Sequence, residues 1–215
     1  IIVPHSKYIV SYGDMDPAVA APYACSGLTA FSALKKIPDT HSEDWIIIIG
    51  AGGVGINGIL LSSAVHRAKI LVIDNNKEKR DKAIEAGAHA AFAPDEEEKI
   101  RSVIGIGASA AIDFVGMPET SDLALSLVKK GGMVVVIGLY GGSLKLSLPL
   151  VPMRSITLRG SYVGELRELR ELVDIIKSGK IKLMPVKRQD LSTANQAMSD
   201  LRAGKVNGRI VLIPS

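Results

Sequence analysis

The chain has 215 residues, enough for one full domain and part of a second, and 47% of them are hydrophobic. Only 4% are aromatic, so the core must consist mainly of Ile, Val, Leu and Ala, as in parallel sheets covered by helices on both faces. The net charge of +4 is scattered, and no stretch approaches the roughly 20 apolar residues that span a bilayer, so neither nucleic acid nor a membrane is an expected partner.

Short apolar runs alternate with helical segments along most of the chain. Asp16-Pro17 is an N-cap followed by proline, which predicts a helical stretch to about Lys36. The predicted strands are 45–50, 69–74, 90–93, 110–115, 133–138 and 156–162. The predicted helices between them are 53–67, 77–87, 95–104 and 119–130. This alternation predicts right-handed crossovers and a doubly wound parallel α/β sheet.

The two ends of the chain break this rhythm. After residue 162 the pattern predicts an amphipathic helix with Leu166, Leu169 and Val173 on one face. Residues 183–215 are expected to form a loop, a helix over 193–203 and a strand over 209–213. The start, Ile1 to Pro4, has no initiator Met and resembles the middle of a strand, so we expect a piece of a longer protein.

Cys25 is the single cysteine of the sequence. A lone cysteine excludes a disulfide within the chain and fits a reducing compartment, so the expected location is the cytoplasm.

The segment Gly50-Ala51-Gly52-Gly53-Val54-Gly55 matches G-x-G-x-x-G between a predicted strand and a predicted helix. In this motif Gly50 permits the tight turn, Gly52 lets a pyrophosphate approach the backbone, and Gly55 lets the helix pack close to the strand. Free N–H groups at the start of the helix then face the pyrophosphate. Gly50, Gly52, Gly53, Val54 and Gly55 are therefore candidate cofactor-binding residues of a Rossmann domain.

Asp74 ends the second predicted strand, 24 residues after Gly50. A carboxylate there can accept both hydroxyls of the adenosine ribose and would repel a 2′-phosphate, so NAD is favoured over NADP. The alternative is that Asp74 caps the helix that starts near Lys77. Asn75 and Lys79 are further cofactor candidates, although Lys79 fits a solvated surface lysine equally well.

Two later strand ends also carry glycine, at Val115-Gly116 and at Ile137-Gly138-Leu139. Because the carboxyl ends of parallel strands line the ligand crevice, small residues there leave room for a flat ring. These five residues are candidate cofactor contacts, and the alternative is that the glycines serve ordinary turns.

The sequence resembles the zinc-dependent alcohol dehydrogenases of the medium-chain dehydrogenase/reductase family over nearly its whole length. The matching segments are 21–30, the loop 50–55, 72–74, 113–116, 160–164 and 207–212. The resemblance implies reversible hydride transfer between an alcohol and an aldehyde or ketone, with NAD as cofactor and zinc as Lewis acid. It also implies a Rossmann domain over 31–164, flanked by parts of a GroES-like catalytic domain at 1–30 and 165–215.

Three further site residues follow from the resemblance. Cys25 stands at the position of the third catalytic zinc ligand, although a free cysteine is more often a small buried hydrophobe. Thr29 lies one helical turn further on, towards the nicotinamide. Arg209 matches a basic residue that contacts the pyrophosphate, and its alternative is an exposed arginine on an edge strand.

The chain departs from the family because the part that carries the first two zinc ligands is absent. The histidines, His5, His41, His66 and His89, do not replace those ligands, so zinc is expected only with the missing segment and this chain alone is expected to be inactive. Two rival interpretations are a zinc-free NADPH quinone-oxidoreductase-like enzyme and a dinucleotide-binding module without catalysis. The resemblance also implies a homodimer or homotetramer, formed through the cofactor domain near the apolar run 133–150.

Overall fold

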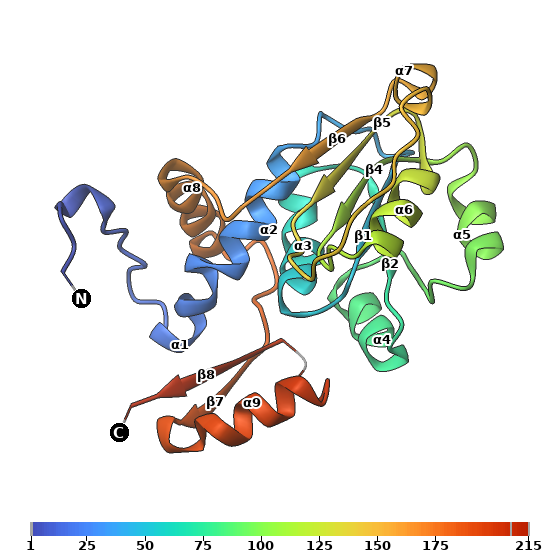
Figure 1. Cartoon of the computed structure of the whole chain (residues 1–215). Coiled ribbons are helices and arrows are strands. Elements are labelled where there is room, and N and C mark those ends of the chain that lie inside the picture. The colour runs from blue at the N-terminus through green and yellow to red at the C-terminus, as the bar shows by residue number, and fades with distance from the viewer. Residues whose placement is uncertain (1, 207, 215) are drawn as a thin grey trace.

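The computed structural model describes residues 2–206 and 208–214, and its centre is a parallel sheet with strand order β3-β2-β1-β4-β5-β6 (Figure 1). The strands are β1 (Trp45–Ile49), β2 (Lys69–Ile73), β3 (Ala90–Phe92), β4 (Ala108–Asp113), β5 (Val128–Val136) and β6 (Thr157–Gly160). The helices that connect them are α3 (Gly53–Val65), α4 (Lys77–Ala86), α5 (Glu97–Ile104), α6 (Pro118–Leu127) and α7 (Leu150–Arg154). This order reverses direction at β1, and the doubly wound sheet is confirmed.

Helices cover both faces of the sheet because its central strands are apolar on both sides. In β1 the side chains alternate, so that Ile46 and Ile48 face one core while Ile47 and Ile49 face the other. The first core is closed by α3, α2 (Ser26–Lys35) and α8 (Leu166–Lys177), and the second by α5 and α6. All four isoleucines are almost fully buried, so β1 is anchored between the two helical layers, and Gly50 follows directly at its carboxyl end.

The helix predicted from residue 16 to residue 36 is interrupted. Asp16 caps α1 (Pro17–Ala20) as expected, with Oδ1 accepting from the Ala18 N–H at 2.8 Å. A short 3-10 helix over 21–24 follows, and Cys25, with φ −128° and ψ −79°, separates it from α2. Pro22 lies where a continuous helix would need another backbone N–H, which explains the break. The backbone therefore changes direction at Cys25.

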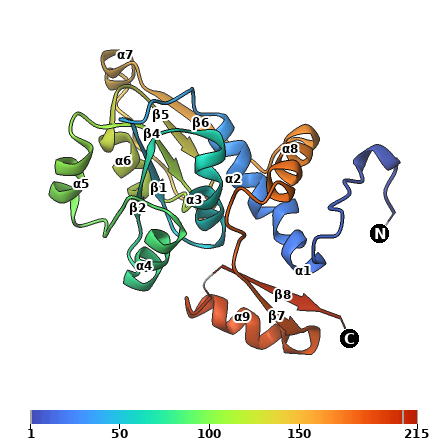
Figure 2. The ribbon, with the colours of Figure 1, turned by 180° about the vertical axis from the view of Figure 1, so that it is seen from behind.

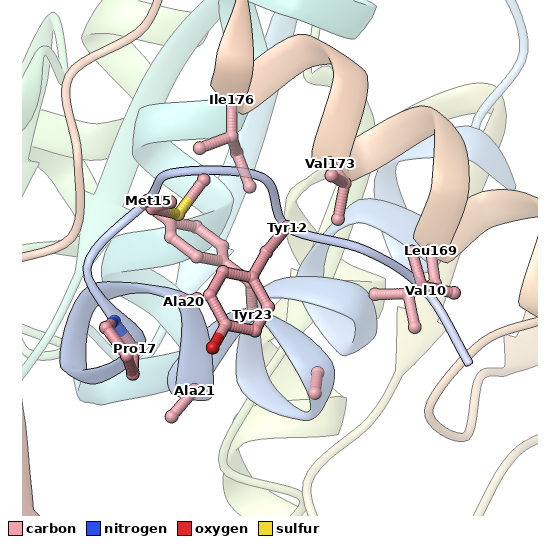
Figure 3. A pocket seen from close by; sticks show the side chains of 11 residues that line it. Val10, Tyr12, Met15, Pro17, Ala20, Ala21, Tyr23, Leu169, Val173 and Ile176 are labelled. Atoms are coloured by element: carbon pink, nitrogen blue, oxygen red, sulfur yellow. The ribbon is translucent and has the colours of Figure 1, made fainter.

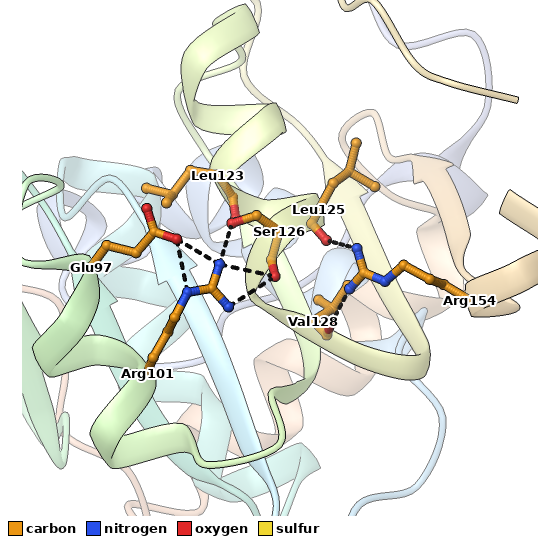
Figure 4. Close-up of polar contacts among 7 residues, drawn as sticks. All are labelled: Glu97, Arg101, Leu123, Leu125, Ser126, Val128 and Arg154. Carbon is orange, nitrogen blue, oxygen red and sulfur yellow. Dashed lines mark hydrogen bonds and ion pairs between the residues drawn. The ribbon is translucent and has the colours of Figure 1, made fainter. Parts of the chain in front are cut away.

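The helix predicted over 119–130 is also shorter than expected, since α6 ends at Leu127 and β5 begins at Val128. Two arginines satisfy carbonyl groups at this helix end (Figure 4). Arg101 of α5 donates to the Ser126 oxygens, and Arg154 of α7 donates to the carbonyls of Leu125 (2.8 Å) and Val128 (2.5 Å). Cations suit this position because the carbonyl end of a helix is electronegative.

Residues beyond α8 form a small layer beside the main sheet (Figures 1 and 2). It consists of β7 (Val186–Asp190), α9 (Ala194–Arg202) and β8 (Arg209–Ile213), with β7 and β8 paired in parallel. The loop predicted over 183–192 was wrong for β7, whose sequence Val-Lys-Arg-Gln-Asp lacks an apolar alternation and which forms by pairing with β8. Asn207, part of the quoted 207–212 motif, lies outside the described residues, as do Ile1 and Ser215.

None of the helices over 2–206 and 208–214 is both long enough and apolar enough to cross a bilayer.

Candidate cofactor-binding site

A cleft of about 670 Å³ opens at the carboxyl ends of β1, β2 and β4, where the strand order reverses. Its lining combines the turn after β1, the ends of β2 and β4 and one residue of β8. The predicted site residues on its wall are Gly50, Gly52, Gly53, Val54, Gly55, Asp74, Asn75, Lys79, Val115 and Arg209. Pro94, Thr120 and Tyr140 also line the cleft, so a ligand in it would contact several separate parts of the chain.

Each glycine of the turn between β1 and α3 is present for a different structural reason. Gly50 has φ +91°, in the left-handed region that favours glycine. A Cβ on Gly55 would lie 1.8 Å from the Gly50 carbonyl oxygen, so α3 can start this close to β1 only without a side chain there. A Cβ on Gly52 would meet nothing within 4 Å. The fold thus requires Gly50 and Gly55, whereas at Gly52 the free space belongs to the cleft.

Asp74 is buried at the end of β2, and its carboxylate is held by backbone N–H groups. Oδ2 accepts from Ala51 N at 2.8 Å and Oδ1 accepts from Asn76 N at 2.9 Å. The cap of α4 is Asn76, whose Oδ1 accepts from Lys79 N, so Asp74 does not fill the alternative capping role. Each carboxylate oxygen can accept more than one hydrogen bond, which leaves Asp74 able to accept from a ligand hydroxyl.

The ends of β4 and β5 are organised by Asp113, which is fully buried. Its Oδ1 accepts from the Val115 and Gly116 N–H groups, and its Oδ2 accepts from the hydroxyls of Thr120 and Ser121, at 2.8–2.9 Å. Gly116 then passes so close to Gly138 that a Cβ on Gly116 would lie 2.0 Å from the Gly138 oxygen.

This contact accounts for the predicted glycines at these strand ends. Val115 lines the cleft, whereas Gly116, Ile137, Gly138 and Leu139 are not among its lining residues. Ile137 is buried and Leu139 is 80% exposed. The two glycines therefore have a packing reason here, independent of any ligand.

Arg209, at the start of β8, lies directly over the first residue of α3. A Cβ on Gly53 would be 2.7 Å from both Cζ and Nε of Arg209, so the guanidinium occupies the space that glycine leaves open. Burial lowers the pKa of Arg209, and the nearby Cys25 opposes that shift. Within the described residues no carboxylate forms an ion pair with Arg209. A half-buried cation without an acidic partner, beside a helix N-terminus, is suited to an anion.

A second cavity, of about 240 Å³, lies between the N-terminal segment, the 3-10 helix and α8 (Figure 3). Its lining is almost wholly apolar, and it shares no lining residue with the cleft. Tyr23 on its wall accepts a hydrogen bond from Met184 N at 3.0 Å, and burial raises the pKa of its hydroxyl. A phosphate would find no cationic side chain in this lining, so the cleft is the better site for a charged cofactor.

Comparison with known proteins identifies the family. The sequence profile described as "Zinc-binding dehydrogenase" matches residues 53–178. The chain belongs to the zinc-binding dehydrogenase family. It is 33% identical to an NAD-dependent alcohol dehydrogenase of Sulfurisphaera tokodaii over 218 residues, covering 100% of this chain and 63% of that protein.

Two further relatives define the range of this similarity. The chain is 32% identical to a D-arabinose 1-dehydrogenase (NADP(+)) of Saccharolobus solfataricus, again covering 100% of this chain and 63% of the relative. The crystal structure of an alcohol dehydrogenase from Aeropyrum pernix superimposes with a TM-score of 0.87 at 31% identity, over 94% of this chain and 60% of that one. The chain thus spans about 63% of the length of the curated relatives it matches.

Zinc is the metal that the family name implies, and the described residues of this chain do not make a site for it by themselves. Cys25 is exposed at the break before α2, and Thr29 is buried one turn later, with its N–H and hydroxyl both donating to the Cys25 carbonyl. Over residues 2–206 and 208–214, no three His, Cys, Asp or Glu side chains lie close enough to hold a metal ion. One thiolate is too few ligands for a zinc site.

Sequence reasoning missed three polar residues around the cleft, Asp113, Ser26 and Asn57. Asp113 was noted only as part of a matching segment, although an acid at the end of an apolar strand signals a buried anchor. Ser26 likewise lies in a matching segment, 21–30, but neither Ser26 nor Asn57 carries a local signal of its own, because a serine at a helix start and an asparagine inside a helix are common. Their side chains form hydrogen bonds with each other and with Arg209 only when α2, α3 and β8 pack together.

Proposed function

We propose that the cleft binds NAD, and that the longer protein to which this chain corresponds transfers a hydride between an alcohol and its aldehyde or ketone. The observation that carries the proposal is that one cleft combines Asp74, the open loop at Gly52 and the guanidinium of Arg209, which forms no ion pair with a described carboxylate. Because both side chains line the same cleft, its acid suits an adenosine ribose and its cation suits a pyrophosphate.

Each part of the cofactor has a proposed partner. The ribose hydroxyls donate to Asp74, with Asn75 and Lys79 beside them on the wall. The pyrophosphate meets the N–H groups at the start of α3 and the guanidinium of Arg209. The nicotinamide then lies beyond Val115, towards Thr29 and Cys25, with Gly116, Ile137, Gly138 and Leu139 at the neighbouring strand ends. Bound NAD would supply the hydride acceptor, so that an alcohol losing a hydride from carbon and a proton from oxygen would become an aldehyde or ketone.

We also propose that Cys25 is one zinc ligand in the longer protein, with the other ligands supplied from outside these 215 residues. Residues 1–30 and 165–215 would then be parts of the catalytic domain that brings those ligands. The exposed thiol, next to the residues that bind the cofactor, supports this assignment. The same reasoning predicts that this chain alone binds the cofactor but does not turn over substrate.

Asp74 also bears on the rival use of NADPH. The D-arabinose relative is named for NADP(+), so both cofactors occur among similar proteins. A buried carboxylate held by two backbone N–H groups cannot move away from a 2′-phosphate, and the two negative charges would repel each other. NAD is therefore our proposal for this chain.

The test is a fluorescence titration of the chain with NADH and with NADPH, repeated for Asp74→Asn. The unmodified chain should bind NADH at least about tenfold more tightly, and Asp74→Asn should erode that preference while it keeps one oxygen for the backbone donors. Asp81→Asn, on the exposed face of α4, is the matched control and should leave the preference unchanged. Equal binding of NADH and NADPH by the unmodified chain would contradict the role of Asp74, and no binding of either would contradict the proposed function.

A further inference from the structure

Ser26, Asn57 and Arg209 form one hydrogen-bonded cluster, although they come from α2, α3 and β8. The Asn57 side-chain Nδ2 donates to Ser26 Oγ at 3.1 Å, and Arg209 Nε donates to the same oxygen at 3.3 Å. Ser26 and Asn57 are 2% and 0% exposed, so solvent cannot substitute for either partner. The cluster lies beneath the phosphate loop, because Asn57 also donates to the Gly53 carbonyl at 3.3 Å.

The Ser26 hydroxyl uses its whole hydrogen-bonding capacity in this cluster. Its proton is donated to the Pro22 carbonyl at 2.9 Å, which leaves both lone pairs to accept from Asn57 and Arg209. An alanine at this position would leave two buried donors without an acceptor. Ser26 therefore fixes the direction of the guanidinium as well as the end of the 3-10 helix.

Asn57 is oriented by the hydrogen bonds that its amide nitrogen donates. Its Oδ1 is buried and has no hydrogen-bond partner within the described residues, an arrangement that destabilises a fold by itself. The two donor bonds from Nδ2, to Gly53 and to Ser26, are what the residue contributes. Asn57 thereby links the first residue of α3 to the serine that holds Arg209.

This arrangement orients Arg209 before any ligand arrives. Nε is taken by Ser26, and the space over Gly53 holds Cζ, so the donors that remain for a phosphate are those on the two Nη atoms. A guanidinium that is already ordered loses little entropy when it binds an anion.

We propose that Ser26 and Asn57 are positioning residues that hold Arg209 against the phosphate loop, so that the pyrophosphate part of a dinucleotide is bound by a clamp assembled from three segments of the chain. This inference rests on the proposed function, because it assigns residues to the pyrophosphate end of the same cleft. It predicts that the cluster matters for ligands that carry a pyrophosphate and not for adenosine, which ends before the clamp.

The experiment measures the affinities of the full chain for ADP-ribose and for adenosine by calorimetry. Ser26→Ala should weaken ADP-ribose binding by about tenfold, the size expected for one hydrogen bond to a charged group, and should leave adenosine binding unchanged. Ser26→Thr, which keeps the hydroxyl, should restore most of the loss. Ser62→Ala is the matched control, since Ser62 is also a buried helical serine bonded to a backbone carbonyl but lies away from the cleft.

A double-mutant cycle separates positioning from general destabilisation. If Ser26 acts through Arg209, then Ser26→Ala should have no further effect in an Arg209→Met background. Thermal unfolding followed by circular dichroism reports whether each variant is folded. Should Ser26→Ala not fold, Asn57→Leu tests the same cluster, with a smaller loss of ADP-ribose affinity and none for adenosine.

The outcomes distinguish the two claims. Equal ADP-ribose affinity in folded Ser26→Ala and the unmodified chain, or additive losses in the cycle, would overturn the inference and leave the proposed function standing. A chain that binds neither ADP-ribose nor NADH would overturn both.

Discussion

At the scale of single residues, the glycines of the phosphate loop separate those that the fold needs from one that a ligand needs. Gly55→Ala would place a Cβ 1.8 Å from the Gly50 oxygen, whereas Gly52→Ala would place one in open space at φ −72°. We expect Gly55→Ala to lower the free energy of unfolding by 3 kcal/mol or more, roughly the upper range of overpacking. Gly52→Ala should change it by less than about 0.5 kcal/mol.

Gly52→Ala should affect cofactor binding rather than stability. Gly52→Ala should remain folded yet lose NADH affinity, because its methyl group occupies the space through which the pyrophosphate approaches the backbone. Urea unfolding and an NADH titration on the same samples check both statements. If Gly52→Ala binds NADH as well as the unmodified chain does, the pyrophosphate does not lie at this loop.

Single residues also show how far the sequence determines a site. The loop glycines and Asp74 could be located from the sequence because their roles depend on neighbours in the chain, namely a strand before and a helix after. Arg209 needed the family resemblance, since nothing local distinguishes it from a surface arginine. Ser26 and Asn57 could not be found, because their hydrogen bonds join segments 31 to 183 residues apart.

At the scale of elements, Asp44 joins the amino ends of neighbouring strands. Its Oδ1 accepts from Lys129 Nζ at 2.8 Å and from Ser109 Oγ at 2.5 Å, and its carbonyl accepts from Lys69 N. The hydrogen bond from Lys129, followed by that from Ser109, holds the pKa of Asp44 well below its usual range. This carboxylate therefore stabilises the sheet only while it is ionised.

The sign of the resulting pH dependence follows from that lowered pKa. The stabilisation is fully present above the ordinary aspartate pKa of about 4 and is lost as the pH falls through the lower value of the folded protein. Asp44→Asn should cost about 1–2 kcal/mol at pH 7, and the difference from the unmodified chain should shrink below pH 4. Urea unfolding at pH 7 and pH 3 measures this, with the exposed Asp122→Asn as control. A difference that stays constant with pH would contradict the role of Asp44.

Elements differ in how well the sequence predicts them, and the reason is local. The strands β1 and β2 and the helix α4 carry their own apolar periods and caps, so their positions were expected. The strand β7 exists only through its pairing with β8, more than twenty residues later, and its own residues are mostly polar. The break at Cys25 depends on Pro22 and on the turn that follows, which a helical pattern of small residues conceals.

At the scale of the whole molecule, the outer strand β6 offers a surface for a second copy. Within the described residues β6 pairs only with β5, and large exposed apolar side chains lie on β6 or within ten residues of it in the chain, among them Leu148, Met153, Leu158 and Tyr162. Unpaired edges and apolar patches of this kind favour association. We propose a homodimer through this edge.

Leu158→Lys tests that interface. Light scattering should give twice the chain mass of 22.8 kDa for the unmodified protein and the mass of one chain for the variant. The reason is that burying the lysine ammonium in the interface would oppose the association of two chains. Leu201→Lys, an exposed leucine on α9, is the control and should leave the mass unchanged. A monomer in the unmodified protein would contradict a dimer formed by this chain.

The central claim is that one cleft receives the whole dinucleotide, and a crystal structure of the chain grown with NADH tests it most directly. We predict the adenosine ribose within hydrogen-bond distance of Asp74 and the pyrophosphate between Gly52 and Arg209. A dinucleotide bound elsewhere, or one bound here with its pyrophosphate away from Arg209, would contradict this account.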